Sequence, residues 1–282
     1  MSDVEQAYAF CRQITHRYGA NFSVGFRFLP REKKRAVHAA YAWCRWADDI
    51  ADEPGEAIPE RLDAWQAELD RAYAGHPTHS ITLALSDSLR RFPIPKSAFV
   101  ALIEGCRQDM VKVRYATFGE LLQYCDLVAS SISDISLSIF GHKTPDAVDY
   151  GRNLSTALQL TNVTRDVGDD LDRDRIYIPL EEIERFGLSE RDLRERRMSD
   201  ALRDLILFQV ERAEGYFRRA EPLLPELSFD SRFPVLLMGS VYARVLAKIR
   251  RDPFAPMVRR VQLSTGEKIG LVATRLLQPH FV

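Results

Sequence analysis

Apolar residues recur every three to four positions along most of the 282-residue chain. This is the period of an α-helix that buries one face. The pattern is clearest in six long segments, at residues 34–52, 61–75, 118–141, 151–171, 199–224 and 234–251. Segments containing Pro or Gly separate them, whereas alternating strand patterns, fixed-period repeats and flexible linkers are absent from the sequence. The sequence therefore predicts a single all-α domain over residues 1–282.

The segment "YAWCRWADDIAD" combines an apolar face with a polar one. At about 100° per residue, Trp43, Trp46 and Ile50 fall on one side of the predicted helix. The other side carries Tyr41, Cys44, Arg45, Asp48 and Asp52. A single pair of carboxylates four residues apart is, taken alone, best interpreted as a solvated charged face.

The segment "LQLTNVTRDVGDD" repeats this arrangement. Its polar residues fall within roughly 80° of arc, and they are Gln159, Asn162, Asp166 and Asp170. Like charges four residues apart destabilise an isolated helix by a few tenths of a kcal/mol. Two helices that both accept this repulsion indicate a shared cation between them.

Composition narrows the partners of the protein. Lys and Arg (39) nearly balance Asp and Glu (40), so no overall basic field predicts nucleic-acid binding. The four cysteines are widely spaced and form no CxxC pair, which favours a reducing cytoplasm. The N-terminal residues do not read as a signal peptide, and no apolar run approaches the ~18 residues that cross a bilayer. We therefore expect a cytoplasmic protein whose charged chemistry is local.

The paired aspartates predict a site for a hard divalent cation. Carboxylate and amide oxygens without His or Cys suit Mg²⁺ and fit zinc poorly. Arg45 and Arg165 lie beside the pairs and favour a metal-bound diphosphate. The chain contains neither a GxxxxGK[ST] loop nor a GxGxxG turn, which argues against a nucleotide. Long apolar helices could wall a tunnel, so a lipid diphosphate satisfies both ends of the site.

The two aspartate-rich segments, "YAWCRWADDIADEPG" and "ALQLTNVTRDVGDDLDRDRIYIP", resemble the signatures of the squalene/phytoene synthase family. The similarity extends through "LIEGCRQDMVKVRYATFGELLQYCDLVA" and "VYARVLAKIRRDPFAPMVRRVQLSTGEK", and so covers nearly the whole chain. It implies an isoprenoid-synthase-type helical bundle with a central apolar cavity. It also implies Mg²⁺-assisted ionisation of a prenyl diphosphate, attack on the carbocation by a second prenyl chain, and rearrangement of a cyclopropylcarbinyl diphosphate.

The resemblance also implies roles for individual residues. The catalytic set is Asp48, Asp52, Asp166, Asp170, Tyr41 and Tyr177. The metal ligands are Asp48, Asp52, Asn162, Asp166 and Asp170. The substrate-binding set is Arg45, Gln159, Asn162, Arg165, Tyr242, Arg260 and Phe26. A tyrosine can donate its hydroxyl to a phosphate while its ring face stabilises a passing cation.

Three features depart from the family pattern or modify it. Gly19 and Asn21 stand where the family has serines, which puts phosphate contacts from that loop into question. Ser130 and Ser133 replace two glycines of the middle helix, where they either bond back to the preceding turn or hold water near a cation. Phe26, with Phe22 and Phe28 nearby, either closes the tunnel and favours fifteen-carbon donors or belongs to the ordinary core.

The expected function is head-to-head prenyl transfer from farnesyl or presqualene diphosphate in squalene or hopanoid biosynthesis. Phytoene synthesis from geranylgeranyl diphosphate is the alternative within the family. "DDIAD" also matches head-to-tail synthases and terpene cyclases, but those lack the second signature. A metal-storage bundle would need Glu-x-x-His pairs, which the chain does not contain. No nicotinamide fingerprint supports NADPH, the oligomeric state is left open, and an apolar product allows peripheral contact with a membrane at release.

Overall fold

The computed structural model describes residues 2–18, 23–52, 57–277 and 280–281. This part of the chain is helical and contains no β-sheet, only two isolated bridges. The helices, in chain order, are α1 (Asp3–Tyr18), α2 (Ser23–Phe26), α3 (Arg31–Asp52), α4 (Ile58–Ala74), α5 (Ser80–Leu89), α6 (Lys96–Val111), α7 (Phe118–Cys125), the π-helix η1 (Asp126–Ser130), α8 (Ser131–Phe140), α9 (Ala147–Arg165), α10 (Val167–Asp172), α11 (Leu180–Arg185), α12 (Glu190–Arg194), α13 (Asp200–Ala220), α14 (Leu223–Glu226), α15 (Phe229–Arg251), α16 (Ala255–Val258) and α17 (Thr265–Leu277).

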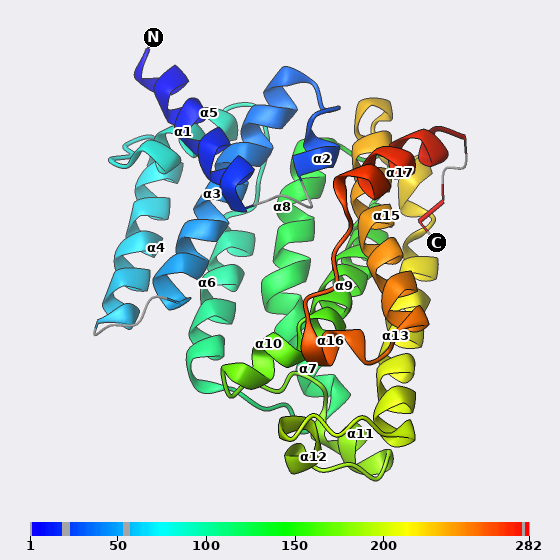
Figure 1. The fold of residues 1–282 in the computed structure, drawn as a ribbon. Helices are drawn as coiled ribbons and strands as arrows, with labels where there is room; N and C mark the ends of the chain where they lie inside the picture. The colour runs from blue at the N-terminus through cyan, green and yellow to red at the C-terminus, as the bar shows by residue number, and fades with distance from the viewer. Residues whose placement is uncertain (1, 19–22, 53–56, 278–279, 282) are drawn as a thin grey trace.

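Figure 1 shows the arrangement of the long helices, of which α3, α6, α8, α9 and α15 line a central cavity. Helices α3 and α6 form one side, α8 and α9 lie in the middle, and α13 and α15 form the other side. Helices α1 and α5 pack on α3, while α11 and α12 lie at the lower end of the view. Among the described residues, no helix is both long and apolar enough to cross a membrane. The predicted all-α architecture is confirmed.

The apolar face of α3 holds that helix in place. Trp43 is fully buried, with its ring stacked on Trp65 at 5.8 Å between centroids and edge-on to Phe99 at 4.8 Å. Aromatic pairs in these geometries stabilise a core by about 0.5–1.5 kcal/mol each beyond their buried area. Because the tryptophan faces the core, the opposite face of α3 points toward the central space with its carboxylates.

Two helices predicted as continuous are modified beside the central space. The segment 151–171 bends at Asp166, where φ is −101° and ψ is 11°. Its helical hydrogen bonds nevertheless continue, from Asp166 N–H to the Asn162 carbonyl (2.9 Å) and from Asp170 N–H to the Asp166 carbonyl (2.8 Å). The segment 118–141 contains the π-helix η1, and π-turns inside α-helices are frequent at functional sites.

The two serines of the middle helix have different surroundings. Ser130 donates its hydroxyl to the Asp126 carboxylate, 3.0 Å away and one turn earlier, which agrees with bonding back to the preceding turn. Ser133 lines the central cavity and lies against Gly151, where an added Cβ would meet the Ser133 oxygen at 2.6 Å. The close approach of α8 and α9 therefore depends on a glycine at this point.

Glu68 on α4 anchors the outer helices, and we expect Glu68→Gln to destabilise the fold by about 3 kcal/mol. Its buried carboxylate accepts hydrogen bonds from Thr82 Oγ1 (2.6 Å) and from the backbone N–H groups of Thr78 (2.7 Å) and His79 (2.9 Å). Burial alone would raise the pKa of Glu68, but the hydrogen bonds from Thr82 and Thr78 outweigh it and lower the pKa to about 2.

Because the folded-state pKa is depressed, this stabilisation is present above about pH 4.5 and is lost as the pH falls toward 2. Urea unfolding at pH 7 and pH 3 measures it. Glu60→Gln, on the exposed side of the same helix, is the matched control and should change the free energy of unfolding little. Equal unfolding free energies for the wild type and Glu68→Gln at pH 7 would contradict the assignment.

Candidate active site

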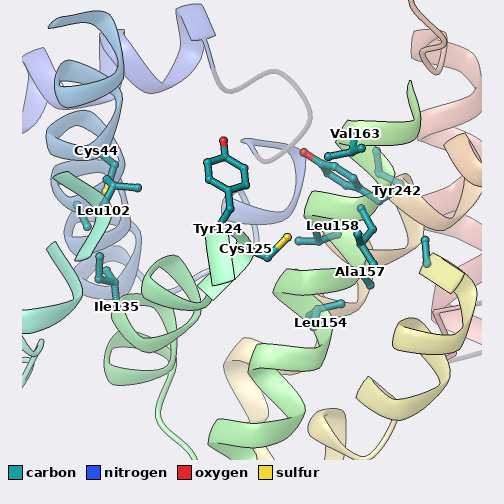
Figure 2. Packing of buried hydrophobic residues seen from close by; sticks show 14 of the residues in the cluster. Cys44, Leu102, Tyr124, Cys125, Ile135, Leu154, Ala157, Leu158, Val163 and Tyr242 are labelled. Atoms are coloured by element: carbon teal, nitrogen blue, oxygen red, sulfur yellow. The ribbon is translucent and has the colours of Figure 1, made fainter. Parts of the chain in front are cut away.

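Both aspartate-rich segments line one central cavity of ≈ 670 Å³. One part of its wall is apolar and comes from α2, α3, α8, α14 and α15. This apolar part includes Phe26, Val37, Leu137, Ile139, Phe140, Leu223, Leu227, Val235 and Met238. Figure 2 shows part of the surroundings, with Cys44, Leu102 and Ile135 on one side, Leu154, Leu158 and Tyr242 on the other, and Tyr124 between them.

All thirteen residues predicted for the site contribute to this cavity. They are Phe26, Tyr41, Arg45, Asp48, Asp52, Gln159, Asn162, Arg165, Asp166, Asp170, Tyr177, Tyr242 and Arg260. They come from five helices, α2, α3, α9, α10 and α15, from the junction of α9 and α10 at Asp166, and from the loops around Tyr177 and Arg260. The structure thus brings together side chains that lie more than 200 residues apart in the sequence.

The first carboxylate pair lies on the last turns of α3. Asp48 accepts a hydrogen bond from the Cys106 thiol at 3.5 Å, and Asp52 lies 3.9 Å from the Arg175 guanidinium. Burial raises the pKa of Asp48 to about 7, and the negative charges of Asp52 and Asp109 add to this effect. An ionised Asp48 is therefore under-compensated by the protein alone, and a nearby cation would stabilise it.

The second carboxylate pair differs in its partners. Asp166 is held by two guanidinium groups, with Arg165 Nε at 2.7 Å and Arg260 Nε at 3.1 Å. Arg165 is itself buried and also hydrogen-bonded to Tyr242, so it fixes Asp166 from inside the protein. Burial and the neighbouring charge of Asp166 raise the pKa of Asp170 to about 7. Each pair thus contains one carboxylate poised to bind a cation.

Asp109 joins two tyrosines on the wall of the cavity. Its carboxylate accepts hydrogen bonds from the hydroxyls of Tyr124 (2.7 Å) and Tyr177 (3.0 Å). The Tyr177 ring lies 5.4 Å from the Tyr124 ring and is stacked at 5.6 Å on Tyr115. Burial raises the pKa of both hydrogen-bonded phenols well above the ordinary value, so they stay protonated at neutral pH.

Sequence reasoning singled out Tyr177 but missed Asp109 and Tyr124. Asp109 had a detectable signal, since it follows Cys106 by three residues and so shares the cavity face of α6. No sequence signal indicated Tyr124, because the direction of its side chain depends on how α7 continues into the π-helix η1. Arg175, Gln262 and Lys268 also line the cavity and were not predicted.

A sequence model of squalene/phytoene synthases matches residues 15–267. The chain belongs to the squalene/phytoene synthase family. It is 38% identical over 282 residues to a 15-cis-phytoene synthase of Synechocystis sp., covering 95% of this chain and 84% of that protein. A 15-cis-phytoene synthase of Synechococcus elongatus is 35% identical, covering 99% and 95% of the respective chains.

Solved structures agree with this membership. The squalene synthase HpnC from Alicyclobacillus acidocaldarius is 32% identical, with a TM-score of 0.84 over 89% of this chain and 95% of that one. A dehydrosqualene synthase in complex with ligand is 27% identical, with a TM-score of 0.90 over 96% and 95%. The protein is therefore a prenyl transferase of the head-to-head class with the predicted isoprenoid-synthase fold. The head-to-tail synthase and metal-storage alternatives are set aside.

The carboxylates of this squalene/phytoene synthase fit Mg²⁺. In the described part of the chain, no three His, Cys, Asp or Glu side chains converge as a self-sufficient metal cluster. Mg²⁺ is commonly bound through one or two carboxylates and completed by substrate phosphates and waters. Asp48 and Asp170, each with a pKa of about 7, have the unsatisfied negative charge that such an ion needs.

The remaining polar residues predicted for the site have partners close to them in the sequence. Asn162 Nδ2 donates to Gln159 Oε1 at 3.3 Å, so their amides lie together on the polar stripe of α9. Arg45 pairs with Asp49, and its guanidinium lies 4.7 Å from the centre of the Tyr18 ring. Burial raises the pKa of Tyr41 and of Tyr242 to about 12, so both phenols are neutral donors at pH 7.

The phenylalanines proposed for the tunnel end separate in the structure. Phe26 is 8% exposed and lines the cavity, as a tunnel cap would. Phe28 is 48% exposed and packs edge-on against Phe233 at 4.9 Å, so its assignment to the tunnel or to the core is wrong. The turn after α2 rotates it outward. Phe22 and the loop positions Gly19 and Asn21 lie outside the described residues.

Proposed function

We propose that the protein condenses two prenyl diphosphates head to head, with farnesyl diphosphate as the donor, on the path to squalene or its hydroxylated or presqualene relatives. The observation that carries the proposal is a single cavity with carboxylate pairs and guanidinium groups in one part of its wall and aliphatic and aromatic residues in another. That arrangement suits a substrate that is anionic at one end and apolar along the rest.

The polar part of the wall would hold the diphosphates. Arg45 on α3 and Arg260 in the loop after α16 both line the cavity and would bind phosphate oxygens, for which guanidinium geometry is well suited. Mg²⁺, held by Asp48, Asp52, Asn162, Asp166 and Asp170, would act as a Lewis acid that neutralises the charge of the departing diphosphate. Gln159 would orient the amide of Asn162, to which it is hydrogen-bonded.

The tyrosines would stabilise the carbocation and favour particular positions for its positive charge. The hydroxyls of Tyr124 and Tyr177 both donate to the Asp109 carboxylate, so this cluster presents electron-rich oxygens beside the cavity. Their rings supply a second electron-rich surface. The apolar wall would keep bulk water away from the cation.

Two observations favour different donors. Phe26 occupies the apolar wall, where a bulky ring limits chain length and favours fifteen-carbon farnesyl diphosphate. The sequence relatives with 33–38% identity are phytoene synthases, which favour a twenty-carbon donor as the second candidate. The described residues carry no other feature that separates the two.

Product analysis with farnesyl, geranylgeranyl and presqualene diphosphates, each supplied separately with Mg²⁺, tests the proposal. We expect farnesyl diphosphate to yield a thirty-carbon product or presqualene diphosphate. Turnover of geranylgeranyl diphosphate alone, with a forty-carbon product, would establish the second candidate. Release of diphosphate without any coupled product would overturn the head-to-head assignment.

A further inference from the structure

An aromatic surface patch, formed by Phe28, Phe229 and Phe233, lies on the outside of the molecule. Phe229 is 86% exposed and Phe28 is 48% exposed. The rings of Phe28 and Phe233 meet edge to face at 4.9 Å. Phe229 precedes Phe233 by four residues on α15 and therefore shares its helix face. Large apolar side chains that are exposed together mark an interaction surface, whereas scattered ones need no explanation.

The patch lies behind the apolar wall of the cavity. Helix α2 and the N-terminal turns of α15 are packed so closely that a Cβ at Gly25 would lie 2.6 Å from the Pro234 carbonyl oxygen. On the inner side of this pair, Phe26, Val235 and Met238 line the cavity. Figure 1 places α2 and the start of α15 at the top of the view, and α10, which carries Asp170, well below.

The border of the patch is cationic. The two segments that form it, residues 27–35 and 229–233, contain six Lys or Arg and only two acidic residues. Arg27 is exposed, and the Arg232 guanidinium lies 6.0 Å from the centre of the Phe229 ring. Some of these charges are paired: Lys33 with Asp230 at 2.6 Å, and Glu32 with Arg91 at 2.5 Å. Glu5 on α1 pairs with Arg35 and lies 3.6 Å from Arg31. The excess positive charge of the border therefore lies mainly on Arg27, Lys34 and Arg232.

We propose that the aromatic patch, together with this cationic border, docks the protein on an anionic lipid bilayer. Exposed aromatic rings enter the interface of a bilayer, and Arg and Lys around them attract anionic headgroups. The proposal rests on the proposed function in one respect, since a hydrocarbon product of thirty or more carbons would then leave beside lipid rather than water. A second copy of the chain is a poorer partner, because a twofold contact would bring the two cationic borders together.

Co-sedimentation with vesicles, without substrate, tests the proposal. The probes are vesicles of phosphatidylcholine with about one-third phosphatidylglycerol, and vesicles of phosphatidylcholine alone. We expect the wild type to bind the anionic vesicles more tightly, and added salt to weaken this binding. Phe229→Glu should lower the apparent affinity roughly tenfold or more, because the ring is removed and a repelled charge is added.

Two further variants complete the design. Arg27→Gln should weaken binding roughly fivefold, as expected for one basic residue at an anionic surface. Met198→Glu is the matched control, since Met198 is 45% exposed and lies four residues after the end of α12. Figure 1 shows α12 at the opposite end of the molecule from α2. It should bind like the wild type. All variants should keep wild-type turnover in detergent.

The proposal is overturned if the wild type binds neither kind of vesicle, or if Met198→Glu loses as much binding as Phe229→Glu. It is also overturned if light scattering shows that Phe229→Glu splits a dimer while vesicles are never bound, because the patch would then join two copies. Vesicle binding is measured without turnover, so its outcome is independent of the product analysis that tests the reaction.

Discussion

Asp48→Ala is expected to lower turnover by at least roughly 1000-fold at saturating Mg²⁺, because stabilising the departing diphosphate is worth several kcal/mol of the barrier. The fold should survive, since the main partner that Asp48 loses is a thiol hydrogen bond from Cys106 at 3.5 Å. Burial raises the pKa of Asp48 to about 7. Its contribution to stability is therefore present at low pH and lost as the pH rises through 7, so removal at pH 8 should be neutral or stabilising.

Asp166→Ala tests the catalytic role less directly than Asp48→Ala, because it is also expected to destabilise the fold. Asp166 is the partner of buried Arg165, and its removal would leave that charge unpaired, at a cost of about 3–5 kcal/mol. From the sequence, both Asp48→Ala and Asp166→Ala are predicted to leave the fold intact, because each removes a repulsion between like charges. The structure corrects that expectation for Asp166 but not for Asp48.

The adjacent residues Asp169 and Asp170 provide a matched comparison on one helix. Asp170 lines the cavity, whereas Asp169 is exposed outside it. Asp170→Asn should therefore lose turnover as Asp48→Ala does, and Asp169→Asn should retain it. Steady-state kinetics over a range of Mg²⁺ concentrations, with melting temperatures recorded with and without inorganic diphosphate, measure both effects. Near-normal turnover of Asp48→Ala would remove this residue from the catalytic set.

Phe26→Ala is expected to shift the preference from farnesyl toward geranylgeranyl diphosphate by at least roughly tenfold. Phe26 is 8% exposed and lines the apolar wall of the cavity, so its truncation enlarges the space available to the prenyl tail. One methylene in an apolar pocket is worth about 1–3 kcal/mol of discrimination. Five added carbons could then change the preference strongly.

If Phe26 only fills the core, the same substitution should cost about 3–5 kcal/mol of stability and leave the donor ratio unchanged. Product ratios in mixed-donor assays and melting temperatures distinguish the two outcomes. Phe28→Ala is the matched control, because Phe28 comes from the same segment but its ring is half exposed and packs on Phe233. It should alter neither the ratio nor, by more than about 1 kcal/mol, the stability.

Local sequence patterns were enough to predict many of the polar residues that line the cavity. The face of a helix is set by residue spacing, so Asp48 and Asp52 could be assigned to the polar face of α3, and Trp43 to its buried face, from the sequence. The same reasoning grouped Gln159 with Asn162, which the hydrogen bond between them confirms. Charge repulsion within each aspartate pair pointed to a cation, a prediction that metal-dependent assays have still to test.

Contacts between residues that are far apart in the sequence could not be predicted from helix periodicity. Asp109 receives the hydroxyls of Tyr124 and Tyr177 from segments 15 and 68 residues away, and no local period encodes that meeting. The Asp166 carboxylate is contacted by Arg165 next to it and also by Arg260, 94 residues later, which no local pattern predicts. Phe28 was misjudged because a turn, rather than a helix period, sets its direction.

By itself the sequence determined the helical class of this protein and its two acidic helix faces, because helix periodicity and charge spacing act within a few residues. Only the tertiary structure decided which carboxylates are buried so deeply that nearby arginines do not offset the rise in pKa, as for Asp48 and Asp170, and which are held directly by guanidinium groups, as Asp166 is. Those differences arise from the burial of the carboxylates and from contacts between residues that are distant in the sequence. Both are present only when α3, α6, α9 and α15 enclose the cavity.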